Sequence, residues 1–235
     1  MKYRNLDLIG TSHIAEQSLN EVKQAIENDK PDIVALELDR KRFYALMHGN
    51  NQKPRLWDMR KIGVRGFVFS LIGAWAEKKL GEQVGISPGS EMKKAAELAK
   101  KHNLRIALID QDIEITLKNL SNALTWKEKW NFIADIFKAV VMRKKEVDFD
   151  LRTVPGKKLI KKLIEKVKER YPNLYRVLVE ERNHIMAKKL MQMMKEHEGK
   201  RILAIVGAGH EEEIIGLIKK GINKVDISYS YSVKA

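Results

Sequence analysis

Four short apolar runs, each followed by a glycine or a charged residue, constrain the fold of this chain more than any other feature. They cover residues 6–9, 33–36, 106–109 and 202–206. Their length and their Ile, Val and Leu content are typical of strands that are buried on both faces. The segments between them have helical apolar spacing, as in residues 19–26 after a predicted N-cap at Ser18 and in residues 91–101. This alternation predicts an α/β fold with a mostly parallel sheet flanked by helices.

One long stretch, about residues 116–195, departs from the alternation because it shows almost only helical periodicity. The periodicity is interrupted at residues 153–156 and again at Tyr171-Pro172. We expect a large helical insertion that forms a lid or one wall of a ligand cleft. The chain of 235 residues, 44% of them hydrophobic, suits one globular domain over residues 1–235. Residues 228–233 are predicted to form a last strand.

Cysteine is absent, which excludes disulfides, thiolate zinc sites and a cysteine nucleophile. Any metal must therefore bind through His, Asp, Glu or water. The net charge of +14 would attract polyanions, but the Lys and Arg residues are spread over helical segments such as residues 157–170. We interpret them as solvated helix faces and do not expect a nucleic-acid partner. The Lys- and Glu-rich composition favours a thermophilic source.

Residues 66–76 form an apolar segment flanked by Lys and Arg, and they leave two interpretations open. A segment of about eleven residues is too short for the roughly twenty that a membrane-spanning helix needs. It is either a core helix or a helix that makes peripheral contact with a membrane or a partner. The first residues lead directly into an apolar strand without a secretory signal, so we expect a cytoplasmic location, with membrane association left open.

Each predicted strand is followed by a residue that can do chemistry: His13, Glu37, Asp110 and His210. In an open parallel sheet, ligands bind beyond the carboxyl ends of the strands, so these side chains should converge. A single Gly-x-x-His sequence is weak evidence, since a histidine there often only caps a helix. Two copies, at residues 10–13 and 207–210, favour a functional role.

Both carboxylates also have a structural interpretation. Glu37 follows a buried-type strand, so it must be paired, hydrogen-bonded or metal-bound, and Arg40 or Arg42 would supply a local ion pair. The run Asp110-Gln111-Asp112 is typical of a turn or a helix cap. No Gly-x-Ser-x-Gly elbow and no phosphate-binding loop of NTPases is present, which argues against a serine hydrolase of the usual kind and against an NTPase.

Taken in order, the chain's motifs resemble those of the TraB/pheromone-shutdown family, which is similar to the GumN and TIKI proteins. They are residues 10–13, residues 31–39 with Arg42, residues 88–92 with Glu91, residues 108–110, residues 181–183 and residues 206–210. Many relatives have Asp where this chain has Asn183. The resemblance implies a fold related to the erythromycin esterase and ChaN-like group.

TIKI proteins are described as metal-dependent proteases, so the resemblance implies a metal-dependent hydrolase with peptides as the expected substrates. It implies His13, Glu37 and His210 as active-site groups and metal ligands, with Arg182 catalytic and Arg42, Glu91, Asp110 and Glu181 supporting. Manganese, cobalt or zinc would suit His and carboxylate ligands. A metal-free route remains open, with a histidine as general base and Arg182 stabilising the oxyanion. A non-catalytic protein that sequesters a peptide or small molecule is the alternative.

Overall fold

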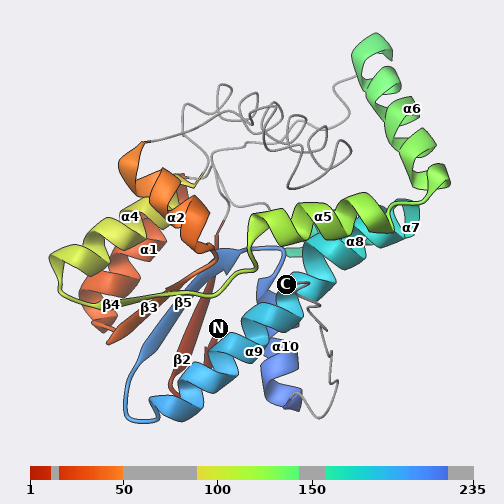
Figure 1. The fold of residues 1–235 in the computed structure, drawn as a ribbon. Helices are drawn as coiled ribbons and strands as arrows, with labels where there is room; N and C mark the ends of the chain where they lie inside the picture. The colour runs from red at the N-terminus through yellow and green to blue at the C-terminus, as the bar shows by residue number, and fades with distance from the viewer. Residues whose placement is uncertain (12–15, 50–88, 143–156, 222–235) are drawn as a thin grey trace, which may run out of the picture.

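The computed structural model describes residues 1–11, 16–49, 89–142 and 157–221, and its centre is a five-stranded sheet (Figure 1). In spatial order the strands are β1 (Lys2–Tyr3), β2 (Leu6–Thr11), β5 (Ile202–Gly207), β3 (Ile33–Leu36) and β4 (Arg105–Leu108). All neighbours are parallel except β1, which pairs antiparallel with β2. The predicted α/β class with a mostly parallel sheet is confirmed, whereas the antiparallel edge strand was not predicted.

The four predicted apolar runs correspond to β2, β3, β4 and β5, and their side chains alternate between the two faces of the sheet. Along β3, Ile33 and Ala35 face one core, while Val34 and Leu36 face the other. Every residue of β3 and β5 is buried. Helices must therefore cover both faces, which is the reason that such strands lack a polar side.

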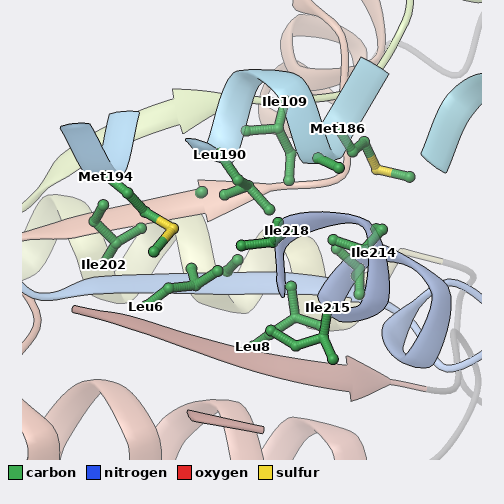
Figure 2. Close-up of a cluster of buried hydrophobic side chains, with 14 of the residues drawn as sticks. Leu6, Leu8, Ile109, Met186, Leu190, Met194, Ile202, Ile214, Ile215 and Ile218 are labelled. Atoms are coloured by element: carbon green, nitrogen blue, oxygen red, sulfur yellow. The ribbon is translucent and has the colours of Figure 1, made fainter. Parts of the chain in front are cut away.

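Helices α9 (Glu181–Glu196) and α10 (Glu211–Lys220) cover one face of the sheet. Figure 2 shows Leu190, Met194 and Ile218 from these helices packed against residues of the strands. Helices α1 (Glu16–Asp29) and α4 (Ser90–Lys101) cover the other face. Helix α9 lies within the stretch predicted as an insertion, yet it is part of the sheet-covering layer.

Helix α1 begins at Glu16, so Ser18 lies inside its first turn with a fully buried side chain. The predicted N-cap at Ser18 is therefore wrong. Glu16 and Gln17 both have good helix propensity, so the helix starts two residues before Ser18. Helix α4 begins at Ser90, one residue before the predicted helical segment of residues 91–101, and Gly89 precedes it in the left-handed region with φ of 79°.

The remaining helices are α2 (Arg40–His48), α5 (Ile113–Ala123), α6 (Trp126–Met142), α7 (Lys157–Arg170), α8 (Pro172–Tyr175) and a π-helical turn, Arg176–Glu180, that leads into α9. Helix α7 ends just before the predicted interruption at Tyr171-Pro172. Figure 1 shows α6 extending away from the sheet. Within the ranges given above, no helix is long and apolar enough to cross a membrane. The predicted segments at residues 66–76 and 228–233 lie outside those ranges.

Two carboxylates tie the helices of this outer layer together. Glu128 of α6 accepts hydrogen bonds from Thr125 and from the backbone and side chain of Asn173 at the start of α8. Asp135 of α6 accepts two bonds from Arg170, both of 2.5 Å. Both ends of the α7–α8 junction are thereby fixed to α6.

Candidate active site at the carboxyl edge of the sheet

Glu37, Asp110 and His210 follow β3, β4 and β5, at the edge where parallel strands end together. Glu37 and Asp110 are only 5% and 2% exposed. Burying two carboxylates is costly unless cations and hydrogen-bond donors surround them. The neighbours of each carboxylate therefore decide what this edge can do.

Both oxygens of Glu37 are engaged. The backbone N–H of Gly207 donates to Oε2 at 2.6 Å, and Arg182 Nη2 donates to Oε1. Strand pairing explains the first contact, because Leu36 lies opposite Ile205 and brings Glu37 beside the end of β5. Burial raises the pKa of Glu37, but electrostatic interactions with His210 and Arg182 lower it more, so the pKa lies below its ordinary value. The carboxylate is thus kept ionised.

Asp110 lies between two guanidinium groups. Arg182 donates to it through Nε at 3.0 Å and Nη2 at 2.6 Å, and Arg42 Nη2 donates at 2.5 Å. Burial raises the pKa of Asp110, but these two arginines lower it to about 2. Asp110 is therefore not the helix cap that its sequence also suggested. Asp112 takes that part, since its side chain accepts from the Glu114 N–H at the start of α5.

Arg42 does not form the local ion pair with Glu37 that its position in the sequence suggested. It binds Asp110 and, through Nε at 2.6 Å, Asp39. Asp39 caps α2 by accepting from the N–H groups of Lys41 and Arg42. The turn that begins α2 therefore holds Arg42 over Asp110.

Arg182 connects the two carboxylates, and each of its three nitrogens donates a hydrogen bond within the protein. Besides Glu37 and Asp110, it donates through Nη1 to the carbonyl oxygen of Leu178 at 3.1 Å. Burial lowers the pKa of Arg182, but Glu37 and Asp110 raise it above its usual value. The guanidinium stays charged and links the residues that follow β3 and β4, Glu37 and Asp110. Lys189 adds a bond of 2.7 Å to the backbone oxygen of Asp110.

His210 directly precedes α10 and lies close to Glu37. Its Nε2 lies 3.5 Å from Oε1 of Glu37, and its Nδ1 lies 2.6 Å from Oδ1 of Asn183. The Nδ2 of Asn183 in turn donates to Glu213 at 2.8 Å. Tyr175 also donates to Glu213, at 3.3 Å, and burial together with this carboxylate raises the pKa of Tyr175 to about 12.

The other residues implied by the family resemblance have different positions. Glu91 is buried in the first turn of α4, with 1% of its surface exposed. Glu181 accepts from Asn119 at 3.3 Å and lies 3.7 Å from Arg176, and both of these residues belong to the helical layer. His13 lies outside the described residues. Glu37, Asp110, Arg182, Arg42 and His210 are the predicted residues that the structure brings together.

Asn183 and Glu213 complete the surroundings of His210 but were not predicted as site residues. From the sequence, Asn183 was notable only because many relatives have Asp at that position. Glu213 belongs to the run Glu211-Glu212-Glu213 in the first turn of α10, where acidic residues are ordinary partners of the helix dipole. The spacing of three residues from His210 to Glu213, which puts both on one side of the helix, was the available signal.

Within the described part of the chain, His210 Nε2 and Glu37 Oε1 are the two site atoms whose chemistry would suit a metal ion. No group of three or more His, Asp or Glu side chains that could hold an ion is found within it. The chemistry of the two donors fits a divalent cation, because Glu37 is ionised and the Nε2 of a neutral imidazole is a ligand for such ions. A third protein ligand would have to come from outside the described ranges, where His13 lies.

Comparison with known proteins places the chain. Its sequence matches the TraB/PrgY/gumN family over residues 3–221. The chain belongs to the TraB/PrgY/gumN family. It is 39% identical over 232 residues to an uncharacterized protein of Methanocaldococcus jannaschii, covering 97% of this chain and 56% of the relative. It is 24% identical to the human and mouse TraB domain-containing proteins, covering 86% of this chain and 60% of each relative. The chain thus spans less than two thirds of the length of these relatives.

Proposed function

We propose that this TraB domain is a metal-dependent hydrolase whose site lies where β3, β4 and β5 end. The observation that carries the proposal is the 3.5 Å approach of His210 Nε2 to the buried, ionised Glu37. An imidazole and a carboxylate at this separation can share a water molecule or a cation. Peptides are the proposed substrates, on the resemblance to TIKI proteins, and the fold is proposed to share the arrangement of erythromycin esterase and ChaN-like proteins.

Glu37, His210 and His13 would hold the divalent ion, which would be manganese, cobalt or zinc. When bound, such an ion acidifies a water molecule and polarises the carbonyl group that the water attacks. The chain's own residues prepare this chemistry. Gly207 and Arg182 keep Glu37 ionised and fixed in place, and Asn183 holds the imidazole of His210 so that Nε2 points toward Glu37.

The hydrogen bonds that Arg182 donates within the protein favour metal-dependent hydrolysis over the metal-free mechanism. Stabilising an oxyanion requires a donor that is available to the substrate. Arg182 instead donates through Nε, Nη1 and Nη2 to Asp110, Leu178 and Glu37. A metal ion would supply the electrophile without removing the guanidinium from two buried carboxylates. We therefore assign Arg182 to positioning the carboxylates.

A binding protein without turnover is the second candidate. It is favoured by one observation, which is that both oxygens of Glu37 already accept hydrogen bonds from the protein. A carboxylate that is satisfied in this way can serve as part of a rigid binding wall. In that case a peptide or small ligand would bind at the same edge and leave unchanged.

Metal content and peptide turnover distinguish the two candidates. The protein would be loaded with Mn²⁺, Co²⁺ or Zn²⁺, its metal measured by mass spectrometry, and a mixed peptide library analysed for cleavage. We expect about one ion per chain, and we expect His13→Ala, Glu37→Gln and His210→Ala each to lose metal and to reduce turnover about 100-fold or more.

His102→Ala is the matched control, because His102 is exposed at the end of α4 and lies at the opposite edge of the sheet. It should keep metal and turnover. Parent protein that binds peptides without cleaving them under any of the three metals would favour the binding protein. Cleavage that survives in Glu37→Gln and His210→Ala would place the activity elsewhere in the chain.

A further inference from the structure

His210 has two ring nitrogens, and Nδ1, the one that faces away from Glu37, lies against Asn183. We propose that Asn183, oriented by Glu213, is a positioning residue that fixes neutral His210 as its Nδ1–H tautomer and leaves the Nε2 lone pair facing Glu37. The use of Nε2 as the acting atom rests on the proposed hydrolytic function. The tautomer itself does not depend on that function.

The orientation of the Asn183 side chain follows from Glu213. Asn183 is fully buried, and one end of its amide lies 2.8 Å from Oε2 of Glu213. A carboxylate accepts hydrogen bonds, so the amide end beside Glu213 must be the NH₂ group. The carbonyl oxygen Oδ1 therefore faces His210, with 2.6 Å between Oδ1 and Nδ1. An amide oxygen cannot donate, so Nδ1 must carry the proton.

Glu213 receives a second hydrogen bond that fixes its position. Its Oε2 also accepts from the Tyr175 hydroxyl at 3.3 Å, so two donors converge on the same oxygen. Tyr175 is 6% exposed and Asn183 is 0% exposed, so water does not compete freely for these bonds. The hydrogen bonds run in one direction on each side of Glu213, from Tyr175 and from Asn183 into the carboxylate. Helices α8, α9 and α10 each contribute one member.

The choice of tautomer decides whether His210 is available for chemistry. In the opposite tautomer the Nε2–H would point at Oε1 of Glu37, and the imidazole would be closed by an internal hydrogen bond. With the proton on Nδ1, an Nε2 lone pair and a carboxylate oxygen face each other at 3.5 Å. Two acceptors at that distance are stabilised by a water proton or by a cation between them. By fixing this tautomer, Asn183 makes the space between His210 Nε2 and Glu37 Oε1 suitable for a water molecule or a cation.

Nitrogen-15 NMR of the metal-free protein tests the proposal, because the two neutral tautomers give different shifts for Nδ1 and Nε2. The His210 signals would be assigned by their loss in His210→Gln, at a pH where the ring is neutral. We expect the parent to show the Nδ1–H tautomer. Asn183→Leu, which removes the acceptor, should move His210 toward the Nε2–H tautomer and weaken Mn²⁺ binding about 10- to 100-fold.

An exchanged pair provides the matched control. In Asn183→Asp combined with Glu213→Gln, the new carboxylate at position 183 accepts from His210 Nδ1–H, and the new amide at position 213 donates to that carboxylate. The Nδ1–H tautomer should therefore be retained. A parent protein in the Nε2–H tautomer would overturn the proposal, as would an unchanged tautomer in Asn183→Leu. The parent spectrum needs no variant, so a misfolded Asn183→Leu protein leaves the test intact. If the tautomer is as expected and no peptide is cleaved, only the hydrolase proposal fails.

Discussion

Glu37 and Glu128 are two buried glutamates in different regions of the molecule, and they are satisfied in different ways. Glu37 is 5% exposed at the end of β3, and Glu128 is 3% exposed in the first turn of α6. The pKa of each lies below its ordinary value, although burial raises both. The groups that overcome burial differ. Charges from His210 and Arg182 lower the pKa of Glu37, whereas neutral donors from Thr125 and Asn173 lower that of Glu128.

The difference separates a structural carboxylate from one in a candidate site. Glu128 forms a capping box with Thr125 and also binds the first turn of α8, so its negative charge meets backbone N–H groups at helix starts. Glu37 faces an imidazole and shares Arg182 with a second carboxylate. Concentrated, opposed charges of this kind are costly to bury and are typical of functional sites.

Removing Arg182 should have the largest effect on stability. Arg182→Ala leaves Glu37 without its guanidinium and leaves Asp110 with Arg42 alone. We expect the free energy of unfolding at pH 7 to fall by about 3–5 kcal/mol, the usual cost of breaking a buried ion pair from one side. Urea unfolding of the metal-free protein measures it. A loss below about 1 kcal/mol would show that the two carboxylates do not depend on Arg182.

Two controls test the cause of that loss. Adding Glu37→Gln and Asp110→Asn to the Arg182 variant removes the two carboxylate charges that Arg182 compensates and should recover most of the stability. Lowering the pH should also reduce the difference in unfolding free energy between the parent and Arg182→Ala. The folded-state pKa of Asp110 is about 2, below the roughly 3.9 of an unfolded aspartate, so the parent loses this stabilisation as the pH falls from about 4 to 2. A difference in unfolding free energy that stays constant over that pH range would contradict a stabilising ion pair between Arg182 and Asp110.

Glu128→Ala should have a smaller effect and no effect on chemistry. It removes the acceptor of bonds from Thr125 and Asn173, and loss of a cap costs about 1–2 kcal/mol. Thermal or urea unfolding would measure the change, and turnover of the peptide library should stay at the parental rate. Glu128→Gln, which keeps one acceptor oxygen, should lose less. Lost turnover in a folded Glu128→Ala protein would mean that the two regions are coupled.

The sequence predicted the sheet well because its buried strands leave a strong local signal. Runs of Ile, Val and Leu that end before Glu37 and before Gly207 marked β3 and β5 within one residue. It could not reveal β1, a two-residue antiparallel strand, since so short an element has no periodicity. Ser18 was a misleading signal because a serine before an apolar stripe is a common N-cap, whereas Glu16 and Gln17 before it also favour a helix.

The candidate site was predicted in part. Parallel topology alone brings Glu37, Asp110 and His210 to one edge, so strand ends were enough to propose them. The partners of these residues were not predictable in the same way. Arg42 lay near Glu37 in sequence, but it binds Asp110, and the cation on Glu37 comes from Arg182, which is 145 residues away. Such pairings depend on how α9 crosses the sheet, which local patterns do not encode.

The most direct test is a double-mutant cycle on peptide turnover with Glu37→Gln, His210→Ala and the combined variant, each loaded with Mn²⁺. If the imidazole and the carboxylate act as one unit, each single variant loses about 100-fold or more and the combined variant loses little beyond that. Losses that multiply in the combined variant, or full turnover in either single variant, would show that His210 and Glu37 do not work together.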